Sequence, residues 1–184
     1  MKFLLTAIAL LLYSSNSFAV VKQWQIIADQ SKLEFVANQA GSDVKGSFKK
    51  FSGEILFDKN ALNASKVNIE IDLSSVFTSS SETVETLKSK DWLDIKSFVK
   101  ATFKSEKFSK ISENKFSTTG ILTIKNKAVP VKLEFEFKEY SASQAKAVGT
   151  ATLNRNDFGI GNKDEKLANG VKGVVKVNFE IVAK

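Results

Sequence analysis

Two charged residues that could bind a ligand, Arg155 and Asp157, lie two positions apart in the stretch RNDFGIG near the C-terminus. The planar guanidinium of arginine suits a phosphate group, so Arg155 is a candidate to meet the head group of a ligand. The alternative is structural, because polar residues at a strand end usually build turns, through an Arg155–Asp157 pair or through backbone contacts. Gly159 and Gly161 do not form a phosphate loop, because no strand and helix flank them.

The sequence contains no His and no Cys. These absences exclude a Ser-His-Asp or Cys-His catalytic centre and remove the commonest zinc ligands. A calcium site built from carboxylates would show a D-x-D-x-D-G loop, which the chain lacks. An enzyme would have to use Asp, Glu, Lys, Ser or Tyr, and no nucleophile–base pair is apparent. We therefore assign no catalytic residue, no metal site and no cofactor.

Two closely spaced carboxylates, Glu134 and Glu136, lie in the stretch VPVKLEFEFK at residues 129–138. They alternate with apolar residues, which is typical of a β-strand with one buried and one exposed face. Lys132 and Lys138 share the charged face, so the carboxylates are better explained as solvated strand residues than as a catalytic pair. The apolar face must then meet a packed core, a membrane or a ligand.

The same alternation recurs along the chain. Segments such as KVNIEIDLSS and KGVVKVNFEIVA place apolar side chains on one face and polar or charged ones on the other. Short polar turns separate these segments, so the pattern predicts eight or nine strands in an antiparallel sheet. Such a sheet hides its apolar face either as a filled sandwich or as a barrel, which at about eight strands can hold one ligand.

One segment, SSSETVETLKSKDWLD, departs from the alternation. Ser79 followed by Glu82 matches a capping box, and apolar residues at helical spacing come next. The pattern predicts a short helix over residues 81–89, inside a long connection between two strands. Trp92 and Leu93 follow it, where they either guard the mouth of an internal space or attach the helix to the sheet.

The N-terminus has the layout of a secretory signal peptide. Lys2 precedes an apolar run, and small residues lead to Ala19, which predicts cleavage after that residue. Residues 1–19 are expected to be removed, and residues 20–184 to form one domain in the periplasm or outside the cell. Without Lys2 the formal charge of +7 becomes 26 basic minus 20 acidic residues, or +6. The lysines are scattered, which argues against nucleic-acid binding and leaves weak attraction to anionic membranes as a hypothesis.

The order and spacing of several segments resemble the YceI-like family of exported bacterial proteins. The resemblance implies a lipocalin-like barrel that binds a polyisoprenoid or another long lipid. We accordingly expect an all-β, antiparallel lipocalin-like barrel of about eight strands, with a short helix in a long connection. The segments that carry the resemblance are IADQSKLEF (27–35), VKGSFKKFSGEILFD (44–58), VNIEIDLSSVFTSS (67–80), LKSKDWLDIKSFVKATFKS (87–105), GILTIKNKAVPVKLEF (120–135) and RNDFGIG (155–161).

The sequence departs from the family pattern at a few positions. Gln30 and the pair Asn38 and Gln39 stand where the family often has His, and Val99 stands where it usually has Pro. Asn126 replaces a hairpin Gly, and asparagine tolerates the left-handed conformation of such a turn. These departures do not affect the expected fold, but they weaken the expectation of His contacts with a ligand head group.

The resemblance also implies that the apolar strand faces line a lipid tunnel inside the barrel. The expected lining residues are Phe35, Phe103, Leu122, Ile124, Leu133, Phe135, Phe137, Phe158, Val177 and Phe179. Each of them also suits an ordinary packed core, so the prediction rests on the set rather than on one residue. Trp92 and Leu93 are expected at the mouth of the tunnel, and Arg155 at the head group.

Three functional hypotheses follow. The first is an exported lipid-binding or carrier protein, which holds a long-chain isoprenoid or other lipid and needs no further cofactor. The second is an enzyme that acts on such lipids. The third is a β-domain with a filled interior that binds a partner. A homodimer, formed through an edge or an end of the barrel, is a further expectation.

Overall fold

A computed structural model describes residues 21–162 and 170–184 of the chain. The predicted signal peptide, residues 1–19, lies outside the described residues. The described elements, in chain order, are β1 (Gln23–Gln25), η1 (Ala28–Gln30), β2 (Lys32–Gln39), β3 (Ser42–Phe48), β4 (Phe51–Leu56), η2 (Leu62–Ala64), β5 (Lys66–Asp72), η3 (Leu73–Ser75), β6 (Val76–Thr78), α1 (Ser81–Lys88), β7 (Lys100–Ser105), β8 (Phe108–Lys110), β9 (Lys115–Ile124), β10 (Lys127–Tyr140), β11 (Ala145–Asn154), η4 (Arg155–Phe158) and β12 (Val171–Ala183), where η denotes a short 3₁₀ turn.

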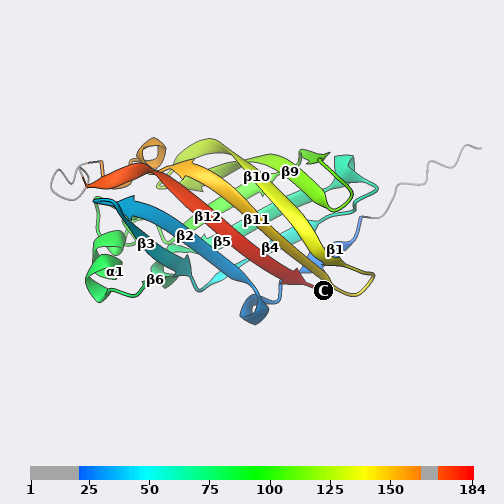
Figure 1. Cartoon of the computed structure of the whole chain (residues 1–184), viewed down its shortest axis with the longest axis horizontal. Helices are drawn as coiled ribbons and strands as arrows, with labels where there is room; N and C mark the ends of the chain where they lie inside the picture. Colours follow the sequence, from blue (N-terminus) through cyan, green and yellow to red (C-terminus); the bar gives the residue numbers. More distant parts are fainter. Residues whose placement is uncertain (1–20, 163–169) are drawn as a thin grey trace, which may run out of the picture.

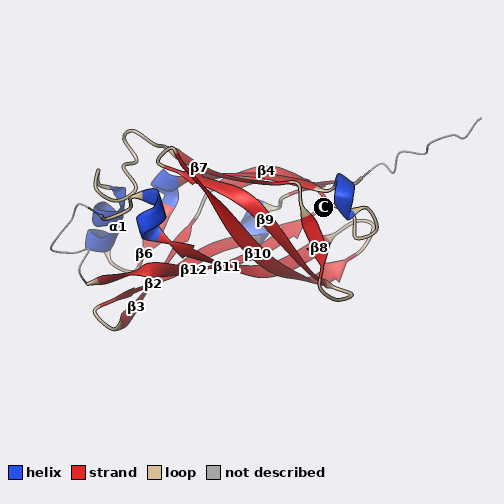
Figure 2. Ribbon diagram, turned by 90° about the horizontal axis from the view of Figure 1, so that it is seen from above, coloured by secondary structure: helices blue, strands red, loops and turns tan. Residues whose placement is uncertain are grey.

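All of these strands belong to one antiparallel sheet that curls around a common axis (Figures 1 and 2). The strand order is β1-β4-β5-β7-β9-β10-β11-β12-β2-β3-β6, and β8 pairs with β9 beside this path. The fold is therefore the expected antiparallel β-barrel with a helix in a long connection. The described residues form twelve strands rather than eight or nine, because the segment GSFKKFSGEILFD makes two strands, β3 and β4, and because β6 and β8 have only three residues each.

The N-terminal strand closes one end of the barrel. Trp24 of β1 pairs with Ile55 of β4, while the backbone of Gln25 exchanges hydrogen bonds of 2.8 and 3.0 Å with Lys184, directly after β12. Ile27 continues the contact, because its N–H donates to the carbonyl of Val182 at 2.8 Å. A strand that pairs with β4 on one side and meets β12 on the other joins two parts of the sheet that are far apart in its strand order.

Alternation holds along the longest strand, β10, and ends at a bulge. Val131, Leu133, Phe135 and Phe137 face the barrel interior, as the sequence predicts. The register with β11 then shifts between Phe137 and Glu139, and an extra residue at such a bulge changes which side chains point inward. The regular alternation of inward-facing side chains on β10 therefore ends at Phe137.

The helix α1 begins at Ser81, as predicted, but its N-cap differs from the predicted one. Ser80, not Ser79, is the N-cap, and its hydroxyl accepts a hydrogen bond of 3.2 Å from the N–H of Thr83. Figure 1 shows α1 beside β3 and β6, at the end of the barrel opposite the C-terminus. In the part of the chain that the structure describes, no helix is long and apolar enough to cross a membrane.

Candidate functional site

The barrel encloses a cavity of about 240 Å³. Its lining reaches from Trp24 and Ala183, at the end closed by β1, to Leu73 and Leu93, at the end near α1. Side chains from most of the strands contribute, because each strand turns one face inward. The cavity is thus the shared interior of the sheet rather than a groove on its surface.

The surface of this cavity is almost wholly apolar. Of the described lining residues only Glu34 and Thr118 are polar, and Glu34 is exposed. The buried hydroxyl of Thr118 donates to the carbonyl of Lys107 at 2.6 Å and also bonds to the hydroxyl of Ser105. A ligand inside this space would find contacts for a hydrocarbon and almost no partner for a polar group.

Nine of the ten side chains expected to line a tunnel do line the cavity. They are Phe35, Phe103, Leu122, Ile124, Leu133, Phe135, Phe137, Val177 and Phe179. The strand pairing brings them together from β2, β7, β9, β10 and β12, which span most of the chain. Their contact with a lipid stays a prediction, since the placement shows only that they share one space.

Phe158 is the predicted lining residue that the structure places elsewhere. It lies in η4, which packs against β10 and β12, and its side chain is only 1% exposed. There it packs behind three lining residues, Phe103, Leu122 and Val131, but it does not itself line the cavity. Strand alternation did not apply to it, because it belongs to a 3₁₀ turn.

Trp92 and Leu93, the two residues predicted at the mouth, have different positions. Leu93 lines the cavity and packs with Leu73 and with Leu87 of α1. Trp92 is buried outside the lining, where its ring lies 5.7 Å from the guanidinium carbon of Arg155. Only Leu93 is therefore placed to contact a molecule in the cavity, while Trp92 attaches the segment after α1 to the rest of the barrel.

Arg155 serves the turn around it rather than the cavity. The side chain is 7% exposed, and its guanidinium donates to the backbone carbonyls of Ile160 at 2.6 Å, Val171 at 2.8 Å and Lys172 at 3.3 Å. Burial lowers the pKa of Arg155 from its ordinary value. Of the two alternatives drawn from the sequence, the geometry fits backbone contacts that shape the turn and does not place Arg155 beside a head group.

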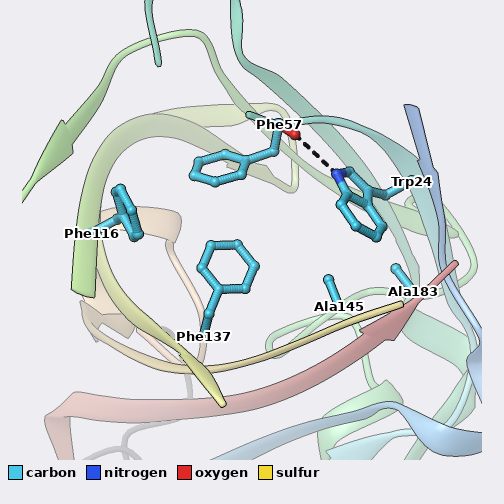
Figure 3. Packing of buried hydrophobic residues seen from close by; sticks show 6 residues of the cluster. All are labelled: Trp24, Phe57, Phe116, Phe137, Ala145 and Ala183. Atoms are coloured by element: carbon cyan, nitrogen blue, oxygen red, sulfur yellow. Dashed lines mark hydrogen bonds between the residues drawn. The ribbon is translucent and has the colours of Figure 1, made fainter. Parts of the chain in front are cut away.

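An aromatic cluster fills the barrel at the β1 end. Figure 3 shows Trp24, Phe57, Phe116 and Phe137 turned toward one another, with the Trp24 indole N–H donating to the Phe57 carbonyl at 3.0 Å. Phe57 contacts Phe116 edge-on at 5.4 Å between ring centroids, and Phe137 at 5.2 Å. Tight packing of this kind closes the cavity at its β1 end.

At the α1 end, hydrogen bonds from Lys125 and Gly161 hold the segment that follows the helix. The ammonium of Lys125 donates to the carbonyls of Lys90 at 3.2 Å and Trp92 at 2.7 Å, just after the helix. Lys125 and Asn126 form the turn between β9 and β10, with φ of +49° and +59°, which confirms the left-handed turn expected at Asn126. Gly161 adds a hydrogen bond of 2.7 Å from its N–H to the carbonyl of Asp91.

Sequence reasoning missed several lining residues. Val67, Ile69 and Ile71 line the cavity and already showed strand alternation, so their signal was present in the sequence. Leu73 continues the same alternation, and Trp24 lies in the alternating stretch VKQWQII, but neither was predicted to line the cavity. Trp24 sits in a strand of three residues, and Leu73 lies in the turn η3.

Among the described residues, Glu34 is the only acidic or basic side chain that lines the cavity. Within residues 21–162 and 170–184 no group of three or more acidic side chains lies close enough together to hold a metal ion. Tyr140, beside the aromatic cluster, has its pKa raised above the ordinary value, first by desolvation. The phenol donates a long hydrogen bond of 3.4 Å to the carbonyl of Phe57.

Comparisons with known proteins agree with this architecture. The crystal structure of BcnA from Burkholderia cenocepacia superposes with a TM-score of 0.80 at 29% identity, and covers 86% of this chain and 99% of that chain. A polyisoprenoid-binding domain from Saccharophagus degradans, described as implicated in plant cell wall breakdown, superposes with a TM-score of 0.71 and covers 88% of this chain and 97% of its own. Its identity of 15% makes that likeness one of fold alone.

Sequence relatives give the family directly. The protein named UPF0312 protein from Pseudomonas savastanoi pv. phaseolicola is 34% identical over 134 residues, which are 70% of this chain and 70% of the relative. The family model described as YceI-like domain matches residues 24–183. That match spans nearly all of the barrel, from β1 to β12. The chain therefore belongs to the YceI-like family.

Proposed function

We propose that the protein is an exported lipid-binding protein that holds and carries the hydrocarbon chain of a long isoprenoid or other lipid inside its barrel. The observation that supports this most is the cavity, whose described lining is apolar apart from an exposed glutamate and a hydrogen-bonded threonine. The neighbour described as a polyisoprenoid-binding domain, which shares the fold, adds support for this class of ligand.

The energetics favour a hydrocarbon chain. A dry cavity of about 150 Å³ lined by Leu, Ile and Phe binds benzene, so the larger apolar space here has room for more than one small ring. Each methylene group that leaves water contributes about 0.8 kcal/mol, and a long chain supplies many such groups. Binding of this kind needs no polar contact inside the barrel, in agreement with the position of Arg155 away from the lining.

The proposal includes export and a binding rather than a catalytic role. Residues 1–19 support export through their signal-peptide pattern, which leaves residues 20–184 in the periplasm or outside the cell. A weak contact with anionic membranes would give access to the lipid, in keeping with the basic charge of the chain. A homodimer stays a prediction, which sedimentation of residues 20–184 would test.

Native mass spectrometry of residues 20–184 tests the proposed function. The protein, stripped of lipid with organic solvent and refolded, is mixed with polyprenols and with fatty alcohols, and added mass is recorded. Two neighbouring residues of β11 offer a matched pair, because Ala151 lines the cavity and Thr150 is exposed. Ala151→Phe fills part of the cavity and should lower lipid affinity at least about tenfold. That is the loss expected when a pocket can no longer hold one methylene group of its ligand.

Thr150→Phe adds the same ring on the outer face and should leave lipid affinity unchanged. If the wild-type protein takes up no polyprenol and no fatty alcohol, the proposed function is wrong. If both variants bind like the wild type, lipid binds outside the barrel. Turnover of a lipid ester that a single carboxylate substitution abolishes would instead favour the enzyme hypothesis.

A further inference from the structure

Two phenyl rings on the cavity wall lie directly over glycines of the neighbouring strand. Phe35 of β2 pairs with Gly46 of β3, and a Cβ atom placed on Gly46 would lie 2.2 Å from the tip of the Phe35 ring. Phe179 of β12 pairs with Gly149 of β11, where the same distance would be 2.3 Å. Carbon atoms in contact are about 3.5–4.0 Å apart, so each ring occupies space that any other residue would fill with its Cβ atom.

A third ring has the same position on another part of the wall. A Cβ atom on Gly120 of β9 would lie 2.4 Å from the tip of Phe103, on the adjacent strand β7. All three rings line the cavity, and they come from three separate strands. The arrangement therefore recurs around the barrel and is not a local accident of one turn.

Glycine within a strand has a cost that these positions must offset. It destabilises a strand interior by about 0.5–1 kcal/mol relative to alanine, because the unfolded chain has more freedom and no side chain packs. What the glycines provide is room, since each lets a large ring lie flat against the sheet instead of standing into the cavity. Without them the same three rings would narrow the space.

We infer that Gly46, Gly120 and Gly149 set the width of the cavity, and that this width admits a methyl-branched hydrocarbon chain. The inference rests on the proposed function. A straight chain is narrower than an isoprenoid chain, whose methyl groups project to the side at regular intervals. A space kept wide by three glycines, each with a cost in stability, fits the branched chain better than the straight one.

Gly46 is the position where the width can be changed with the least disturbance of the backbone. The three nearest atoms to a Cβ on Gly46 all belong to the Phe35 ring. At Gly120 and Gly149 a Cβ would also meet a backbone carbonyl of an adjacent strand, at 2.5 and 2.6 Å. Alanine at those two sites would distort the sheet, whereas at Gly46 it displaces a side chain.

The test compares Gly46→Ala with a control glycine of β12. A Cβ on Gly173 would meet the side-chain ends of Asn154 at 2.7 Å and Asn156 at 3.0 Å, and none of the three residues lines the cavity. Delipidated residues 20–184 are titrated with two alcohols of equal carbon number, geranylgeraniol and eicosanol. Gly46→Ala should lower the affinity for geranylgeraniol about tenfold more than for eicosanol, the effect of roughly one carbon of lost space, and Gly173→Ala should leave the ratio unchanged.

The double variant Gly46→Ala with Phe35→Leu restores room and should return the ratio toward the wild-type value. It also keeps the test informative if Gly46→Ala alone fails to fold. An unchanged ratio in Gly46→Ala, or a crystal structure of it with the Phe35 ring still against the sheet, would overturn the inference. Failure of the wild type to bind either alcohol would instead contradict the proposed function, while the ring position in Gly46→Ala would still decide the role of Gly46.

Discussion

Phe116 and Phe135 stack on paired strands of the barrel, with ring centroids 5.8 Å apart and 25° between the ring planes. The two rings touch and yet have different surroundings. Phe116 is fully buried and does not line the cavity, whereas Phe135 is half-buried and does. One ring is thus packed on all sides, and its partner has an open side toward the interior.

This contrast predicts different costs of truncation. Phe116→Ala should lower the free energy of unfolding by the full core penalty of about 3–5 kcal/mol. Phe135→Ala should cost less than about 3 kcal/mol, because fewer contacts are lost and lipid can refill the space. Urea unfolding of both variants, with and without bound lipid, measures the difference. Equal losses in the two variants, both unaffected by lipid, would show that Phe135 is ordinary core.

Enlarging the same residue should act on ligand length. Phe135 lies between the aromatic cluster and the rest of the cavity, in contact with Phe57 and Phe137. Phe135→Trp should therefore shorten the usable cavity and lower the affinity for long chains by about tenfold while short chains bind as before. A series of fatty alcohols of increasing length, bound to wild type and variant, checks this. Uniform weakening at every length would indicate disturbed folding instead, as expected of an overpacked interior.

The position of Arg155 predicts a loss of stability without a change of ligand preference. Lysine cannot reproduce the forked guanidinium that donates to Ile160, Val171 and Lys172, and bonds to a charged group are each worth about 1.5–3 kcal/mol. Arg155→Lys should thus lower the free energy of unfolding by about 1.5–3 kcal/mol or more, the worth of at least one of these hydrogen bonds. Its preference between a polyprenol and the matching polyprenyl phosphate should equal that of the wild type. Selective loss of the phosphate in a protein of unchanged stability would restore Arg155 as a head-group residue.

The sequence was informative where a strand is long and regular. Alternation placed Leu133, Phe135 and Phe137 correctly, because the side chains of a strand alternate between its two faces. It failed at Phe158, which lies in a 3₁₀ turn, and it did not show that Trp24 lines the cavity, because that position depends on how the barrel closes. Such contacts join segments far apart in the chain, so no local pattern contains them.

The sequence was also ambiguous where several residues of the same type follow one another, because each of them could fill the same role. In the run of serines before α1 each residue can cap, and the hydroxyl of Ser80 rather than that of Ser79 meets the N–H of Thr83. The role of Gly46 was equally hidden, since a glycine in a sequence does not show the ring that will lie over it. The chemistry of Arg155 alone left a ligand contact and a turn role open, and its neighbours in the structure are backbone carbonyls of β12 and of the preceding turn.

The Lys125 contacts predict where lipid enters. Lys125→Met removes the ammonium that holds the carbonyls of Lys90 and Trp92, and should loosen the segment after α1. We expect faster hydrogen exchange at residues 88–95 and faster uptake of a fluorescent fatty acid by stopped flow. Lys127→Met, an exposed position on the other side of the same turn, is the control and should change neither. Faster exchange with unchanged uptake would place the entrance elsewhere.

The last prediction concerns Tyr140, the only tyrosine of residues 20–184. Its ring packs against Phe137 at 4.8 Å and Trp24 at 5.4 Å, and desolvation is the main cause that raises its pKa above the ordinary value of 10.0. Because the folded state disfavours the phenolate, the stabilisation linked to this group is complete below the unfolded pKa and is lost as pH rises through the folded pKa. Absorbance titration of residues 20–184 should give a midpoint above that of the protein in guanidinium. The Trp24→Ala variant, which admits water beside the phenol, should shift the midpoint back toward the unfolded value, whereas equal midpoints for folded and unfolded wild type would mean that Tyr140 is solvated and the aromatic cluster open.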